Sequence, residues 1–102
     1  MSISILKNDE LNRFEIYSDG ELAGFAEFKV ENQMISYTHT EIDTGFGGQG
    51  LGSQLIKEVL DEALEQNLEV APYCSFVSAY IKKNSEKYLH LVPESKRAKF
   101  DL

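Results

Sequence analysis

Apolar and polar residues alternate along the first half of the chain, in the manner of β-strands. Residues 12–18 show this two-residue period, which predicts a strand with one buried face. Asp19-Gly20 follows and predicts a tight hairpin turn, because both central positions of such a turn need a positive φ angle. Residues 21–30 and 34–43 are expected to form two more strands, with Gly24 marking a bulge or a close approach. The first half should therefore fold as an antiparallel meander.

The second half changes to the period of a helix. Residues 51–64 predict an amphipathic helix, with charged side chains opposite an apolar face. That face consists of Leu51, Leu55, Ile56, Val59, Leu60, Ala63 and Leu64. Asn67 is expected to end this helix, because asparagine tolerates the left-handed conformation of a C-terminal cap. Residues 75–84 are expected to form a second helix.

Between these helices, residues 68–73 predict a short strand that contains Pro72. Because proline cannot donate a hydrogen bond to a sheet, one side of this strand should be unpaired near its end. Past Pro93 the chain is polar, and residues 93–102 are expected to fray. The predicted fold is α/β with a mixed sheet, in which an antiparallel meander precedes a loop–helix–strand–helix unit. We expect a single domain over residues 1–102.

Composition narrows the classes of function. Hydrophobic residues make up 42% of the chain and charged residues 26%, which is typical of a folded soluble domain. The net charge of −7 disfavours nucleic acid, whose binding depends on contacts with phosphate. The single cysteine indicates a reducing compartment, and neither a signal peptide nor a membrane span is apparent, so we expect a cytoplasmic protein. No cluster of His, Cys and Asp has the spacing of metal ligands.

A glycine-rich loop carries the strongest functional signal. Four of the seven glycines lie between Gly47 and Gly52, just before the first predicted helix. Glycines let backbone N–H groups converge, and a helix N-terminus adds a partial positive charge. Together these features predict a pocket for phosphate. The alternative is that the glycines form only a tight turn.

Three kinds of phosphate loop are possible here. A Walker A loop needs Lys and then Ser or Thr after its last glycine, but Ser53-Gln54 follows Gly52, which excludes it. Residues 45–50 match the dinucleotide-binding fingerprint, and such a protein would bind NAD. A hairpin before the loop and a chain of 102 residues disfavour the longer parallel sheet that this fold needs.

The third kind rests on a resemblance. The run Gly48-Gln49-Gly50-Leu51-Gly52, leading into Ser53-Gln54-Leu55-Ile56, resembles the acetyl-CoA loop of the GCN5-related N-acetyltransferases (GNAT family). The family pattern is Gln/Arg-x-x-Gly-x-Gly/Ala, and Gly47 stands where Arg or Gln is expected. A small single-domain bacterial branch of the family is also similar at residues 20–28, 39–42 and 74–83. The last of these stretches carries a Cys-x-Phe-Val-x-x-Tyr-Ile motif, and the similarity extends from Phe14 to Val92.

The resemblance implies a compact acyl-CoA N-acyltransferase fold, in which the third and fourth core strands separate around the pantetheine arm of acetyl-CoA. Backbone groups of Ile42, Asp43 and Thr44 are then expected to bind pantetheine. The pyrophosphate is expected on the backbone of Gly47, Gly48, Gln49, Gly50, Leu51, Gly52 and Ser53. The chain lacks room for the two helices that longer members place after their first strand. The acceptor site should therefore be open or completed by a partner.

Three side chains are candidates for the chemistry. Cys74 precedes a predicted helix, a position that favours a thiolate able to carry the acetyl group or line the thioester pocket; a buried apolar role is the alternative. His39 could take a proton from an attacking amine, with Glu41 orienting its ring or contacting a cationic acceptor. By the resemblance, Tyr80 could protonate the departing CoA thiolate. When the family pattern is counted from the first residue of the helix, however, its tyrosine position coincides with Ile81.

These expectations describe an acetyl-CoA-dependent N-acetyltransferase acting on a primary amine of a small molecule or peptide. Direct attack by the amine with a base near His39 is the default route, and relay through Cys74 is the second. Lys82 and Lys83 could reach the 3′-phosphate of CoA. The alternative is a non-catalytic CoA-binding or protein-interaction module. We expect a monomer or homodimer without a nucleic-acid or membrane partner.

Overall fold

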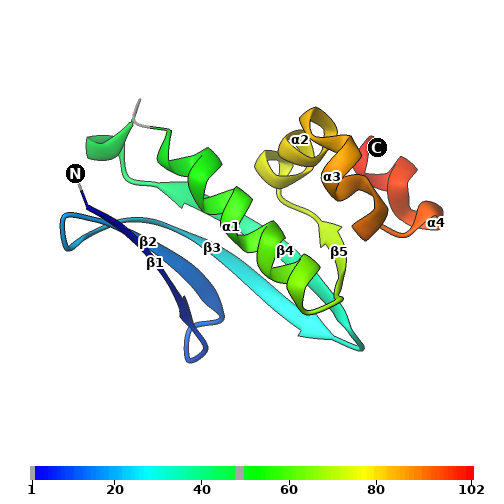
Figure 1. Cartoon of the computed structure of the whole chain (residues 1–102), viewed down its shortest axis with the longest axis horizontal. Coiled ribbons are helices and arrows are strands. Elements are labelled where there is room, and N and C mark those ends of the chain that lie inside the picture. The colour runs from blue at the N-terminus through cyan, green and yellow to red at the C-terminus, as the bar shows by residue number, and fades with distance from the viewer. Residues whose placement is uncertain (1, 48–49) are drawn as a thin grey trace.

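The strands of the computed structural model, which describes residues 2–47 and 50–102, form one sheet in chain order (Figure 1). The first four strands are antiparallel, and the fifth runs parallel to the fourth. Their bounds are β1 Ile3–Asn8, β2 Arg13–Ser18, β3 Glu21–Glu31, β4 Met34–Ile42 and β5 Glu69–Pro72. The mixed α/β sheet predicted from the sequence is confirmed.

Two tight hairpins join the central strands. Asp19 and Gly20 have φ angles of 50° and 83°, and Asn32 and Gln33 have φ angles of 49° and 65°. Positive φ at both central positions matches the twist of the flanking strands. The Asp19-Gly20 turn is the one predicted from the sequence, and its geometry confirms that prediction.

Strand β1 is not among the predicted strands. It pairs with β2 through Ile5 opposite Ile16 and Ile3 opposite Ser18, so the antiparallel part has four strands rather than three. Only Ile3 and Ile5 alternate before Leu6 interrupts the period. An alternation this short does not distinguish a strand from an irregular terminus.

Helix α1, Leu51–Glu65, runs across the sheet in front of β3 and β4 (Figure 1). Its buried residues are Leu51, Gly52, Leu55, Ile56, Val59, Leu60 and Ala63, which include most of the predicted apolar face. Tyr37 of β4 donates its hydroxyl to the Val59 carbonyl at 2.7 Å, so this buried polar atom is satisfied. Asn67 follows the helix with φ 56°, as expected of a residue that ends it.

The chain after β5 gathers beside α1 at the β5 end of the sheet (Figure 1). It contains α2 Ser75–Lys83, α3 Ser85–Tyr88, α4 Glu94–Arg97 and the 3₁₀ turns Leu89–Leu91 and Ala98–Phe100. Residues 93–102, which the sequence led us to expect to fray, contain α4 and the last 3₁₀ turn. The Phe100 ring lies 5.1 Å from that of Tyr73, and Asp101 pairs with Lys82 at 3.0 Å. The contact between the Tyr73 and Phe100 rings and the Lys82–Asp101 ion pair hold this polar segment against the rest of the chain.

A bulge divides β4 into two parts. His39 lies opposite Glu27 and Tyr37 lies opposite Phe28, so Thr38 is an extra residue in the ladder. Pairing with β5 ends at Tyr37 and Pro72, after which the Cys74 N–H donates to the Tyr37 carbonyl at 2.9 Å. This loss of pairing at Pro72 agrees with the sequence prediction. Within the described residues, the edge of β4 from 38 to 42 that faces away from β3 therefore has no partner strand.

The sheet face opposite α1 contains a buried carboxylate. Glu15 is only 6% exposed and accepts hydrogen bonds from Arg13 at 2.7 Å, Tyr17 at 2.8 Å and Asn8 at 3.2 Å. Burial by itself would raise the pKa of Glu15, but the bonds from Arg13, Tyr17 and Asn8 outweigh it, so the pKa is lowered.

No helix among the described residues is both long and apolar enough to cross a bilayer.

Candidate active site

The open edge of β4 and the N-terminus of α1 lie next to each other. A Cβ atom built on Gly52, in the first turn of α1, would be 3.6 Å from Cγ1 of Ile42, at the end of β4. The loop between the two elements contains Gly48 and Gln49, which lie outside the described residues. A ligand that follows the free edge of β4 therefore arrives at the start of α1.

The start of α1 suits an anion. Gly50 precedes the helix with φ 72°, a left-handed conformation that favours glycine. Among the described residues no side chain caps the helix, and its first turn contains no acidic residue. The N–H groups of this turn are thus left without intrahelical partners at the positive end of the helix dipole. The Leu51 side chain is buried in the core, so this residue can offer a ligand only its backbone.

Several backbone groups of residues 43–47 already make hydrogen bonds within the protein. The Asp43 N–H donates to the Ala23 carbonyl at 2.8 Å, and the Asp43 carboxylate accepts from the Gly45 N–H at 2.9 Å. The Thr44 carbonyl accepts from the Gly47 N–H at 3.3 Å. Backbone groups of successive residues point to opposite edges of a strand. Of the predicted pantetheine contacts, Ile42 therefore directs its backbone to the open edge, whereas the Asp43 N–H is already used.

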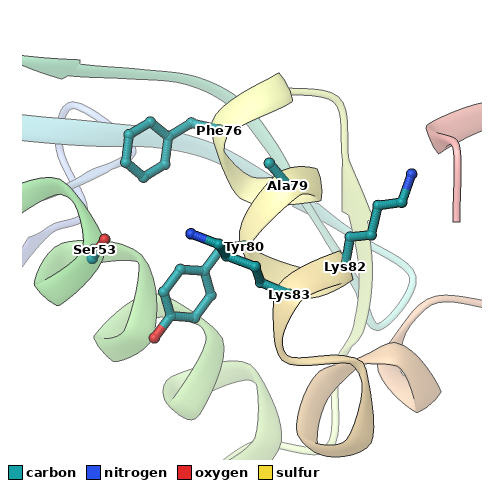
Figure 2. A pocket seen from close by; sticks show the side chains of 6 residues that line it. All are labelled: Ser53, Phe76, Ala79, Tyr80, Lys82 and Lys83. Atoms are coloured by element: carbon teal, nitrogen blue, oxygen red, sulfur yellow. The ribbon is translucent and has the colours of Figure 1, made fainter.

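A groove of about 540 Å³ separates α1 from α2 (Figure 2). Its lining residues are Ser53, Phe76, Ala79, Tyr80, Lys82 and Lys83. The Tyr80 hydroxyl points across the groove toward α1, and the Phe76 ring projects from the first turn of α2 (Figure 2). Lys82 forms an ion pair with Asp101, whereas Lys83 forms none with any described residue. The groove begins beside the uncapped end of α1 and carries positive charge.

Cys74 lies at the junction of β5 and α2. It is partly buried, and its thiol donates to the Thr40 hydroxyl at 3.5 Å. Thr40 belongs to the open part of β4, so the thiol lies against that edge on the face covered by the helices. The sequence predicted that Cys74 directly precedes a helix, and the structure confirms this position. The hydrogen bond to the Thr40 hydroxyl was not predicted.

His39 lies on the other face of β4. Its ring is 6.1 Å from the Phe25 ring, and its Nε2 is 3.4 Å from a carboxylate oxygen of Glu41. The side chain is 52% exposed. Because His39 and Thr40 are consecutive in a strand, their side chains project to opposite faces. The structure therefore brings His39 to Glu41, as the sequence suggested, but it does not bring His39 to Cys74.

Tyr80 lies on α2, six residues after Cys74, which is about 9 Å along a helix axis. Its ring packs 6.0 Å from that of Tyr88, and it also lines the groove. Phe76, which also lines the groove, is not among the residues that the sequence singled out. Val77 and Ile81 are buried, whereas Phe76 is 43% exposed. The signal was available, because Val77 and Ile81 form one stripe at a spacing of four residues and Phe76 and Tyr80 form another.

Among residues 2–47 and 50–102, no three His, Cys, Asp or Glu side chains gather as ligands of a metal would. Two titratable side chains on the open part of β4, His39 and Glu41, lie 3.4 Å apart and form a pair.

The sequence model of a family described as GCN5-related N-acetyl-transferase matches residues 13–91. A comparison with curated protein sequences found no significant match. Among solved structures, the chain is similar to a GCN5-like candidate N-acetyltransferase from Staphylococcus aureus, with 27% identity and a TM-score of 0.64. That similarity covers 88% of this chain and 87% of the other.

Two longer proteins share the fold at lower identity. The ribosomal-protein-S18-alanine N-acetyltransferase from Escherichia coli is 22% identical with a TM-score of 0.56, over 62% of this chain and 41% of that one. Ard1 from Thermoplasma volcanium is 23% identical with a TM-score of 0.53, over 58% of this chain and 41% of that one. The chain thus spans less than half the length of these two proteins.

Proposed function

Because the chain belongs to the GCN5-related N-acetyltransferase family, we propose that it transfers the acetyl group of acetyl-CoA to a primary amine. N-acetyltransferases of this family generally use acetyl-CoA. The observation that carries the proposal is the continuity between the unpaired edge of β4 and the uncapped N-terminus of α1. The edge of β4 offers hydrogen bonds to an extended chain, and the N-terminus of α1 offers hydrogen bonds to a diphosphate.

In this proposal the diphosphate of CoA binds the first N–H groups of α1. The left-handed Gly50 and the absence of a first-turn carboxylate both support an anion there. The pantetheine arm runs along β4 and uses the backbone of Ile42, much as an added strand would. Lys83 supplies a positive charge for the 3′-phosphate, because Lys82 is already paired with Asp101.

The acceptor amine attacks the thioester carbonyl carbon, the C–S bond breaks, and the CoA thiolate leaves. The proton released by the attacking nitrogen passes to His39, whose exposed ring is oriented by Glu41. The thiolate takes a proton from the Tyr80 hydroxyl. In the second route the Cys74 thiolate attacks the thioester carbonyl and the CoA thiolate leaves; the amine then attacks the acetyl-Cys74 carbonyl, and the Cys74 thiolate is released. Since His39 and Cys74 lie on opposite faces of β4, the two routes use different residues and can be tested apart.

The acceptor is proposed to be cationic. The chain has a net charge of −7, and Glu41 lies beside His39 on the open part of β4. An acidic surface raises the local concentration of ammonium groups. Polyamines, lysine side chains and peptide N-termini are therefore the first acceptors to examine.

Calorimetric titration with CoA, acetyl-CoA and NAD tests the binding part of the proposal. We expect both CoA forms to bind and NAD to show no affinity. Release of free thiol in the presence of a panel of primary amines tests the reaction. No uptake of CoA would contradict the proposal, and uptake without thiol release from any amine would contradict its catalytic part.

A further inference from the structure

Phe76 has an unusual position for a large apolar residue of a short amphipathic helix. Its neighbours Val77 and Ile81 point into the core and are fully buried. Phe76 instead points into the groove between α1 and α2, together with Tyr80 (Figure 2). A large apolar side chain that stays exposed inside a groove indicates a binding surface.

The ring of Phe76 rests on α1 at Gly52. A Cβ atom at that position would lie 2.8 Å from Cζ and 3.3 Å from Cε2 of the ring. Real Cβ contacts of 2.8 Å do not persist, so any larger residue at position 52 must push the ring away. Gly52 lies within the helix without a positive φ, so its backbone does not require glycine. The Phe76 ring is what a larger residue at this position would displace.

We propose that Phe76, seated on Gly52, is a binding residue for the pantetheine arm of CoA and that Gly52 is its positioning residue. This inference rests on the proposed function, which places the pantetheine arm along the edge of β4 and the diphosphate at the start of α1. The ring and Ile42, at the end of the open edge of β4, both lie next to Gly52 in the first turn of α1. The methylene and gem-dimethyl groups of pantetheine are apolar, and an aromatic face that stays exposed in the free protein gains contact by covering them.

A different explanation of Gly52 is that a phosphate needs close approach to the backbone there. The two explanations predict different behaviour when Phe76 is made smaller. If Gly52 serves the ring, Gly52→Ala should be harmless once the ring tip is gone. If Gly52 serves the phosphate directly, Gly52→Ala should weaken binding equally with either side chain at position 76.

The test measures the Kd for CoA in the wild type, Gly52→Ala, Phe76→Leu and the double variant. We expect Gly52→Ala to raise the Kd at least about fivefold, and Phe76→Leu to raise it about threefold. The double variant should bind like Phe76→Leu alone. Full additivity of the two changes would overturn the inference. Ile35→Val, a buried change at the far end of β4, is the control for lost stability and should leave the Kd unchanged.

A truncated ligand provides a second test that does not depend on how Gly52→Ala folds. 3′-Phosphoadenosine 5′-diphosphate is CoA without its pantetheine arm. Phe76→Ala should weaken CoA about tenfold and leave the affinity for this fragment unchanged. Equal losses for both ligands, or no loss for either, would overturn the role of Phe76. If the wild-type protein takes up neither ligand, the proposed function itself fails, and that outcome is distinct from both of these.

Discussion

Substituting Gly50 by Ala perturbs the proposed diphosphate site through the backbone alone. Gly50 has φ 72°, and a Cβ atom there would meet nothing within 4 Å. Steric clash therefore plays no part, and the effect comes from forcing an L-residue into the left-handed region. Gly47 is the matched control, because it belongs to the same loop but has φ −64° and ψ 150°, which any residue adopts. A Cβ atom at Gly47 would make only an ordinary contact with the Thr44 carbonyl, at 3.5 Å.

The magnitude follows from these angles. Holding an L-residue in the left-handed conformation costs about 1–2 kcal/mol. Gly47→Ala should instead be neutral or stabilise the fold by about 0.4–1 kcal/mol, since it restricts only the unfolded chain. If the Gly50→Ala loop keeps its shape without ligand, the strain appears as lost stability. If the loop relaxes when free, the same strain appears as a CoA affinity that is weaker by roughly 5–30-fold.

Urea unfolding with and without saturating CoA, combined with calorimetric Kd values, captures both cases. The CoA-bound form of Gly50→Ala should be less stable than that of Gly47→Ala by about 2 kcal/mol. This difference is the same whether the strain is already present in the free loop or arises only when CoA binds. Equal stability of the two bound variants would refute the reasoning, because it would mean that the bound loop does not need a left-handed residue at position 50.

Four further predictions concern other substitutions. Gly47→Arg restores the side chain that the family pattern places there and should tighten CoA binding about three- to tenfold by calorimetry; unchanged affinity would mean that this side chain adds no contact. His39→Gln should lower turnover about a hundredfold and alter the pH–rate profile, and an unaltered profile would exclude His39 as the base. If the acetyl group passes through Cys74, Cys74→Ala abolishes thiol release at unchanged CoA affinity, whereas full turnover removes that route. Glu15→Gln should cost about 1–3 kcal/mol at pH 7 in urea unfolding. Because the folded pKa of Glu15 is lowered, its contribution is present above its unfolded pKa of about 4.3 and is lost as the pH falls through the folded value, so the wild type and variant should converge in acid; a constant gap would contradict this.

Local sequence signals predicted much of the fold. The Asp19-Gly20 turn, the long amphipathic helix and the left-handed Asn67 depend on residues that lie next to one another in the chain. Gly24 was expected to mark a bulge or close approach, and a Cβ atom there would clash with the Glu41 carbonyl. Each of these features follows from backbone preference or helical period, which a single sequence displays directly.

The site was harder to predict because it depends on register between strands. Simple alternation from Tyr37 would place His39 on the helix-covered face of β4. The extra residue Thr38 reverses this, and it puts Thr40 beside Cys74. A bulge arises from pairing with β3, so β4 alone does not reveal it. Phe76 illustrates a second limit, since a helix with two neighbouring apolar stripes can bury only one of them here.

In the proposed complex the first backbone amides of α1 and the open edge of β4 bind CoA. Titration of ¹⁵N-labelled protein with CoA, followed by amide resonances, shows which backbone groups the ligand contacts. We expect the largest shifts at residues 50–53 and at Ile42, with smaller shifts along α2 at the groove. Shifts confined to other surfaces, or none at saturating CoA, would contradict it.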